Sequence, residues 1–129
     1  MVGGVSVSGR FVVQEHHASH LHWDFRLEMD SVLKSWAVPK EPPTRPGVRR
    51  LAVLVEDHTV DYIDFEGTIP DGEYGAGTVE IWDSGVYELE SRRPDKLVFR
   101  LDGGKMRGRY TLVHFTEKAE NWLLFKTKS

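Results

Sequence analysis

The chain has 129 residues, with 17 basic and 20 acidic side chains. This length fits one domain over residues 1–129, and the net charge of -3 argues against broad, nonspecific coating of nucleic acid, although not against a local basic pocket. The absence of cysteine excludes disulfides, thiolate metal sites and cysteine nucleophiles, so any metal must be held by His, Asp, Glu or main-chain oxygen. No stretch approaches the roughly 18 apolar residues of a membrane span, and the N-terminal MVGGVSVSGR lacks the apolar core of a signal peptide, so we expect a cytoplasmic protein with no membrane partner.

Short runs of alternating apolar and polar residues recur along the chain, with turn residues between them. Strands are predicted at residues 10–15, 21–29, 32–38, 50–56, 62–66, 77–82, 86–90, 96–101, 109–115 and 122–127. Asp30-Ser31 and Asp83-Ser84-Gly85 are predicted turns, the proline-rich KEPPTRPG at 40–47 is a loop, and 116–121 holds at most one helical turn. Many short strands with tight turns predict an all-β fold, either a compact antiparallel β-barrel or a sandwich, with little helix.

The predicted strand LHWDFRLEM, residues 21–29, alternates strictly between apolar and polar side chains. Because alternate residues of a strand share a face, its apolar residues face a core and its polar ones point together on the other side. These polar residues are His22, Asp24, Arg26 and Glu28. An ordinary solvated face has the same alternation, but this one offers two metal ligands followed by an anion clamp.

Histidines concentrate around this strand, since four of the six lie between positions 16 and 22. His22 and Asp24 can reach one ion, and His16 ends the preceding predicted strand. Two imidazoles and one carboxylate leave positions open for water or substrate and suit Mn, Fe(II) or Zn. The same set also forms the facial triad of non-haem iron oxygenases. We interpret His17 and His20 as surface histidines beside this site.

Further cations follow on the chain. Arg26 is a planar donor fork suited to phosphate or carboxylate oxygens. Lys40 and Arg49-Arg50 bracket the proline-rich loop, and EDH at 56–58 ends the strand that Arg50 begins. These groups beside a metal would suit a phosphorylated substrate, although solvated loop charges would give the same pattern.

The glycine-rich DGEYGAG at 71–77 is followed by a strand pattern, which excludes a dinucleotide-binding GxGxxG. Its glycines are expected to allow a tight corner or a close backbone approach, with a phosphate cradle as the less favoured alternative. The four tryptophans lie in predicted strands and are assigned to the core. They are Trp23, Trp36, Trp82 and Trp122.

The motifs QxH, LHxDFRLE, SWAVPK, EDH and GxIPxGxYGxG, with WLLFK near the C-terminus, together resemble the 3′-phosphoesterase domain of bacterial DNA ligase D and its free-standing relatives. The resemblance covers about residues 11–126. It implies a compact β-barrel that uses manganese to process the 3′ end of a DNA or RNA-tipped primer in break repair by non-homologous end joining. The implied reaction removes a terminal ribonucleoside and then the remaining 3′-phosphate, with a DNA ligase and Ku-like end-binding proteins as implied partners.

The resemblance also implies roles for individual residues. The family's metal ligands match His16, His22 and Asp24, for Mn²⁺ with Zn²⁺ or Co²⁺ as substitutes. Its phosphate-contacting and catalytic residues match a second set, with Lys40 assisting phosphomonoester removal and two further residues supporting the site. The second set is Arg26, Arg50, His58 and Tyr62, and the supporting residues are Gln14 and Glu56.

Two departures from the family pattern stand out. Trp23 occupies the position of a common tyrosine in LHYDFRLE, but this position faces the apolar side, so packing rather than chemistry is expected to differ. The sequence also begins about ten residues before the first motif and carries no ligase or polymerase domain, so free-standing action is expected. A non-haem iron oxygenase and a nonenzymatic nucleic-acid end-binding barrel remain the alternatives.

Overall fold

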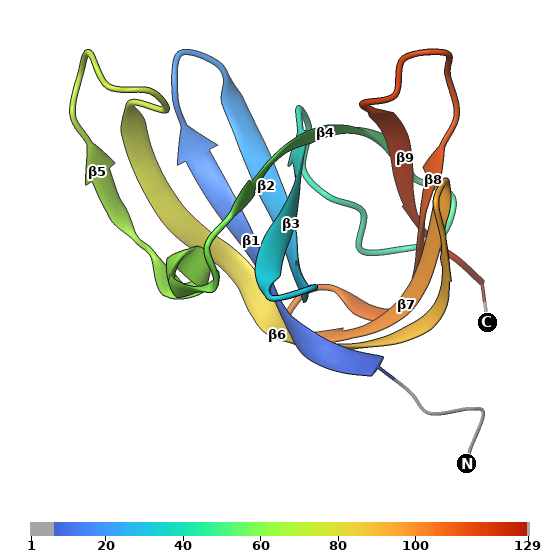
Figure 1. Ribbon diagram of the computed structural model, residues 1–129. Helices are drawn as coiled ribbons and strands as arrows, with labels where there is room; N and C mark the ends of the chain where they lie inside the picture. The colour runs from blue at the N-terminus through green and yellow to red at the C-terminus, as the bar shows by residue number, and fades with distance from the viewer. Residues whose placement is uncertain (1–6, 129) are drawn as a thin grey trace.

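The computed structural model describes residues 7–128, which form nine strands and one 3-10 helix (Figure 1). The elements are β1 (Val7–His17), β2 (Leu21–Met29), β3 (Val32–Val38), β4 (Arg49–His58), η1 (Val60–Asp64), β5 (Gly67–Ile69), β6 (Gly77–Arg93), β7 (Lys96–Gly103), β8 (Arg107–His114) and β9 (Asn121–Lys126). Within this range no helix is long and apolar enough to cross a lipid bilayer. The expectation about a signal peptide falls partly on residues 1–6, outside the described residues.

The strands close into an antiparallel barrel, as predicted. The hydrogen-bonded order runs β1-β2-β3-β4-β9-β8-β7-β6, and β6 returns to pair with β1 (Figure 1). β5 lies outside this ring and pairs only with the first residues of β6. Closure leaves few free backbone edges, and it allows one sheet to enclose the core by curving around it.

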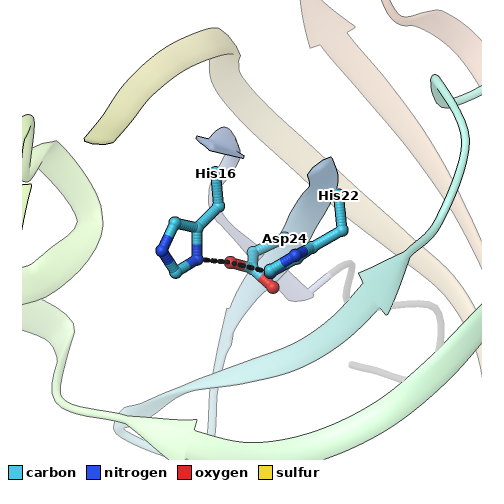
Figure 2. Close-up of side chains that lie close together, drawn as sticks. All are labelled: His16, His22 and Asp24. Atoms are coloured by element: carbon cyan, nitrogen blue, oxygen red, sulfur yellow. Dashed lines mark ion pairs between the residues drawn. The ribbon is translucent and has the colours of Figure 1, made fainter. Parts of the chain in front are cut away.

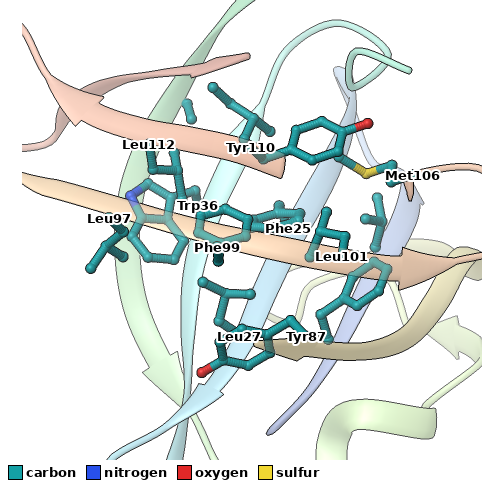
Figure 3. Packing of buried hydrophobic residues seen from close by; sticks show 14 of the residues in the cluster. Phe25, Leu27, Trp36, Tyr87, Leu97, Phe99, Leu101, Met106, Tyr110 and Leu112 are labelled. Carbon is teal, nitrogen blue, oxygen red and sulfur yellow. The ribbon is translucent and has the colours of Figure 1, made fainter. Parts of the chain in front are cut away.

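The core forms on the apolar face of the strands. Phe25 and Leu27 of β2 are fully buried, and the Phe25 ring packs against Trp36 of the neighbouring strand β3 and Phe99 of β7 (Figure 3). Of the four tryptophans assigned to the core, three belong to this cluster, whereas Trp82 is only partly buried against it. Trp23 is one of the three, so the departure from the family's tyrosine does fall on the packing face.

The predicted turn at Asp83-Ser84-Gly85 is wrong, because β6 runs through it as one strand of 17 residues. Asp83 is buried, and its carboxylate accepts hydrogen bonds from the backbone N–H groups of Gly104, Lys105 and Met106. Gly85 is needed for a close approach, since a Cβ there would lie 2.1 Å from the Asp102 carbonyl oxygen. Aspartate and glycine are common in turns, but here Asp83 and Gly85 contact the β7–β8 region and do not reverse the chain.

The predicted strand at 62–66 is also wrong. Residues 60–64 form the 3-10 helix η1, and the strand that follows is the short β5. Tyr62, Ile63 and Phe65 give this segment the composition of a strand, but it pairs with no strand of the described residues, and local i→i+3 hydrogen bonds form instead.

Two other turn predictions are confirmed. Asp30 and Ser31 both have positive φ, as a two-residue hairpin turn with the native twist requires. Gly77 allows the close backbone approach expected of the glycine-rich turn, since a Cβ there would lie 2.2 Å from the His17 carbonyl oxygen. The segment 116–121 contains bends and a turn without helix, and 40–47 is a loop.

Candidate metal centre and phosphate site

The β1–β2 hairpin places the predicted metal ligands side by side. His16 lies directly opposite His22, and Asp24 is the next residue on the same face (Figure 2). One Asp24 oxygen, Oδ2, lies 3.6 Å from His16 Nδ1 and 3.3 Å from His22 Nε2. One ligand atom from each of the three residues lies within 4.8 Å of the others. The polar face of β2 is therefore not a solvated surface, since Asp24 and Arg26 are both buried.

Two backbone carbonyls orient the imidazole rings. The Gly75 carbonyl accepts a hydrogen bond from His16 Nε2 at 2.8 Å, and the His20 carbonyl accepts one from His22 Nδ1 at 3.1 Å. Because a carbonyl oxygen can only accept, each of these nitrogens carries the proton, and the other nitrogen of each ring faces Asp24. Such orientation by a second hydrogen bond is typical of metal-binding histidines, so the donor set fits a divalent metal ion.

The electrostatics favour a charged cluster. Burial raises the pKa of Asp24, but the hydrogen bond from His22 and the charges of Arg26, His22 and His16 outweigh it and hold that pKa below its usual value. The hydrogen bond to Asp24 raises the pKa of His22 against the opposing effect of burial. Since Nδ1 of His22 is bound to the His20 carbonyl, an added proton sits on Nε2, where a metal ion would replace it.

Arg26 is held rigidly beside the triad. Its Nε donates to Gln14 Oε1 at 2.6 Å, its Nη1 donates to Ser35 Oγ at 2.8 Å, and its Nη2 lies 3.5 Å from Asp24 Oδ2. The guanidinium also lies over the Tyr62 ring, 5.1 Å from its centroid. Burial lowers the pKa of Arg26, but arginine stays cationic at physiological pH. The result is a fixed positive charge next to the candidate metal ligands.

An aromatic stack covers this arginine. His58 stacks on Tyr62 with centroids 4.6 Å apart, and Tyr62 stacks on Phe65 at 4.8 Å. The fully buried Gln14 ties the stack to the sheet, because its amide donates to the carbonyls of Tyr62 and Phe65. Burial and the charge of Arg26 lower the pKa of His58, so its imidazole is mostly neutral at physiological pH. Burial likewise raises the pKa of Tyr62.

Among residues 7–128, no hydrogen bond or ion pair joins three predicted site residues to this cluster, although the charge of Glu56 acts against the lowering of the His58 pKa. Arg50 pairs with the core residue Leu124, so it lies on the opposite sheet face from Asp24, and its Nε donates to the Glu41 carbonyl at 2.8 Å. Lys40 and Glu56 are exposed. Their predicted roles stay predictions.

The remaining histidines near the site behave as surface residues. His17 and His20 are exposed, as expected. His17 Nε2 lies 2.6 Å from Glu15 Oε2, and Glu80 completes a second group with metal-ligand types. That group is more exposed than the triad, and within residues 7–128 no lysine or arginine forms an ion pair with its carboxylates.

Sequence reasoning missed two contributors to the site. Ser35 is fully buried and directly opposite Arg26, a position that follows from the hairpin register set by the turn at Asp30-Ser31. That register could be inferred from the sequence. The Gly75 carbonyl could not, because the path of the glycine-rich turn over His16 depends on tertiary contacts.

Comparison with known proteins bears on this arrangement. The sequence profile of the DNA Ligase D 3′-phosphoesterase domain matches residues 14–114, which include the triad, Arg26, His58 and Tyr62. The chain belongs to this family.

Members of the 3′-phosphoesterase family with similar sequences occur in several bacteria. The chain is 52% identical over 126 residues to the multifunctional non-homologous end joining protein LigD of Pseudomonas aeruginosa. It is 49% identical over 123 residues to the multifunctional non-homologous end joining DNA repair protein LigD of Mycobacterium tuberculosis, and 48% identical over 130 residues to LigD of Mycolicibacterium smegmatis. Each match covers 92% of this chain but only 15–17% of the relative's length. The chain thus corresponds to one part of these longer proteins.

Proposed function

We propose that this chain is a manganese-dependent phosphoesterase that processes DNA 3′ ends during non-homologous end joining. It removes a 3′-terminal ribonucleoside from a primer strand and then the 3′-phosphate, which leaves a 3′-hydroxyl for ligation. The observation that carries the proposal is the convergence of His16, His22 and the fixed Arg26 cation on one buried carboxylate, Asp24. Membership of the family and the names of its LigD relatives support the same reaction class and repair pathway.

The metal would be held by His16 Nδ1, His22 Nε2 and the Asp24 carboxylate. A divalent ion bound there would polarise a phosphoryl oxygen and lower the pKa of a coordinated water or hydroxyl. Manganese fits this set of nitrogen and oxygen donors, as do Zn²⁺ and Co²⁺.

The chain's own residues position the phosphate. Hydrogen bonds from Nε and Nη1 to Gln14 and Ser35 hold the Arg26 guanidinium in place, so it is already oriented when substrate binds. A fixed cation of this kind stabilises the extra negative charge that a phosphoester carries during attack, without reorganisation at that moment. The neutral His58 ring can donate one N–H hydrogen bond to a phosphate oxygen. His58 could act as a general acid only if the bound phosphate raised the pKa of the His58 imidazole.

Tyr62 supports both groups, because its ring stacks on His58 and its centroid lies 5.1 Å from the Arg26 guanidinium. We therefore assign Tyr62 to the orientation of these two groups. Lys40 is proposed to assist phosphomonoester removal, with Arg50 contacting phosphate and Glu56 supporting the site, on the family resemblance alone.

A non-haem iron oxygenase would use the same triad. The buried arginine next to the triad would suit a phosphate or a carboxylate, and membership of the 3′-phosphoesterase family favours the phosphorylated substrate over an oxygenase reaction. A nonenzymatic end-binding barrel would use the cation but would not need histidines oriented for metal.

The test compares two primer–template duplexes that differ only in the sugar of the primer's 3′ nucleotide. A primer with one terminal ribonucleotide is expected to be shortened in the presence of Mn²⁺, and its all-deoxy counterpart is not. The distinguishing feature is the terminal 2′-hydroxyl. Equal cleavage of both primers would indicate a general 3′-exonuclease. Oxygen uptake, or binding without turnover, would support the two alternatives.

A further inference from the structure

Six arginines form ion pairs with carboxylates, and the other eleven of the 17 lysines and arginines have no carboxylate within 4.0 Å among residues 7–128. A cation site must therefore be distinguished by where unpaired cations gather. Arginines of β1 and β6–β8 form ion pairs with carboxylates, in the pairs Arg10–Glu28, Arg92–Asp30, Arg100–Glu90, Arg107–Asp102 and Arg109–Glu90. Arg49, Lys126 and Lys128 have no carboxylate within 4.0 Å among residues 7–128. In a chain with a net charge of -3, an unpaired group of this kind is a local excess of positive charge.

Arg49 and Lys128 line one groove of about 260 Å³, which we call the basic groove. Lys126 also lines it, but it pairs with the core residue Tyr110, and its side chain lies beside Gly108 on the other sheet face from Arg49. It is bounded by Pro46 and Gly47 of the β3–β4 loop, by Arg49 of β4 and by residues 125–128, and no acidic residue lines it. An isolated bridge between Pro46 and Lys126 fixes the loop against the end of β9, and Figure 1 shows the loop passing close to that strand. The walls of the groove are thus held by backbone contacts.

Arg49 is positioned for binding without an acidic partner. It lies directly opposite Phe125 in the β4–β9 pairing, and its guanidinium lies over the Phe125 ring, 4.7 Å from the centroid. Stacking orients the planar group and leaves its edge N–H groups for oxygen acceptors, which suits the phosphates of a nucleic acid.

The sheet register places Arg49 on the same face as the metal and phosphate site. Asp24 pairs with Ala37, which pairs with Val53 of β4, and alternate residues of β4 then lead to Leu51 and Arg49. Arg26 pairs with Ser35, and Ser35 pairs with Val55 of β4. Arg49 lies six residues before Val55 on the same strand. At about 3.3 Å per residue, the basic groove is roughly 20 Å from Arg26 along the strand.

We propose that the basic groove binds backbone phosphates of the DNA whose 3′ end lies at the metal and phosphate site. Successive phosphates of a duplex strand are about 3.4 Å apart along its axis, so 20 Å corresponds to a contact about six nucleotides from the end. This inference rests on the proposed function. It adds the length of DNA duplex that the domain contacts, which the proposed function does not specify. The contact adds affinity without base specificity, because it is made to phosphate.

The experiment uses two DNA hairpins that have the same 3′-ribonucleotide end and stems of about four or about twelve base pairs. At about 3.4 Å per base pair, only the longer stem spans 20 Å. Binding is measured by fluorescence anisotropy over a range of salt concentrations. The test variant carries Arg49→Gln and Lys128→Gln, two cations that line the groove. The matched control carries Arg93→Gln and Lys96→Gln, which removes the same charge from the exposed β6–β7 hairpin, outside the groove.

For the long hairpin, the test variant should raise Kd by roughly 3- to 30-fold, the range expected for two exposed ion contacts. The slope of log K against log salt should become shallower by about 0.7 to 0.9 for each phosphate that the variant no longer neutralises. The control should match the unmodified protein, since charges beyond about 8 Å are screened at physiological salt. Equal losses on both hairpins, or equal losses in both variants, would overturn the inference.

Turnover separates this inference from the proposed function. Trimming of the short hairpin should be unchanged in the test variant, which also shows that it is folded. If the unmodified protein binds the long hairpin more tightly than the variant but trims neither, the chemistry is wrong and the groove assignment stands. If trimming occurs and the two proteins have the same Kd and salt slope on the long hairpin, the groove assignment is wrong and the chemistry stands.

Discussion

Replacing Gln14 with methionine tests whether the buried amide is what holds the phosphate site together. Methionine keeps the length of the side chain and removes both of its polar groups. The Arg26 Nε–H then loses its acceptor, and the carbonyls of Tyr62 and Phe65 each lose the hydrogen bond from Gln14, although the Tyr62 carbonyl keeps the one from the Phe65 backbone N–H. Gln14 and Arg26 are both buried, so water cannot readily replace these partners.

The size of the effect follows from these contacts. An unpaired donor in a buried site costs about 1 to 3 kcal/mol, and each hydrogen bond removed from a carbonyl costs about 0.5 to 1.5 kcal/mol. Gln14→Met should therefore lower the free energy of unfolding by about 2 to 6 kcal/mol. At about 4 °C per kcal/mol for a domain of this size, Tm should fall by roughly 8 to 24 °C.

Stability is measured by urea denaturation followed by tryptophan fluorescence. The matched control is Thr111→Val, which removes a polar group from another buried position, on β8. Trimming by Gln14→Met, assayed well below its Tm, should fall at least tenfold because Arg26 and η1 lose their common anchor, while Mn²⁺ binding measured by calorimetry should persist. A variant as stable as Thr111→Val, with normal turnover, would refute the reasoning.

The remaining predictions concern the metal and the arginine. His22→Ala or Asp24→Ala should abolish stoichiometric Mn²⁺ binding and leave the circular dichroism spectrum unchanged, because the opposite face of β2 packs in the core. Retention of one bound ion with normal turnover would show that the ligand assignment is wrong. Arg26→Lys should keep Mn²⁺ affinity but lower turnover about a hundredfold or more, since one ammonium cannot donate to Gln14 and Ser35 and also face the phosphate. Full activity in this variant would contradict the geometric argument.

The sequence was most informative where one strand or one hairpin decides the outcome. The alternation of residues 21–29 correctly separated the core face, with Phe25, from the polar face, with Asp24. The turn at Asp30-Ser31 correctly set the ends of both flanking strands. These predictions succeed because a strand's side-chain period and a two-residue turn are local properties of the backbone.

Predictions failed where a distant segment decides the backbone conformation. Asp83 and Gly85 have the composition of a turn, yet Asp83 binds backbone N–H groups of the β7–β8 connection and Gly85 makes room for the Asp102 carbonyl. No local pattern distinguishes a turn aspartate from one that binds a segment some twenty residues later.

The candidate site divides in the same way. Residue types and spacing alone pointed to His16, His22, Asp24 and Arg26, because a hairpin necessarily brings these positions together. Only the tertiary structure decided which imidazole nitrogen faces Asp24, since the carbonyls of Gly75 and His20 orient the rings. It also decided that Arg50 lies on the other sheet face from Asp24 while Arg49 shares that face, because the pairing of β4 with β3 and β9 sets the direction of each side chain.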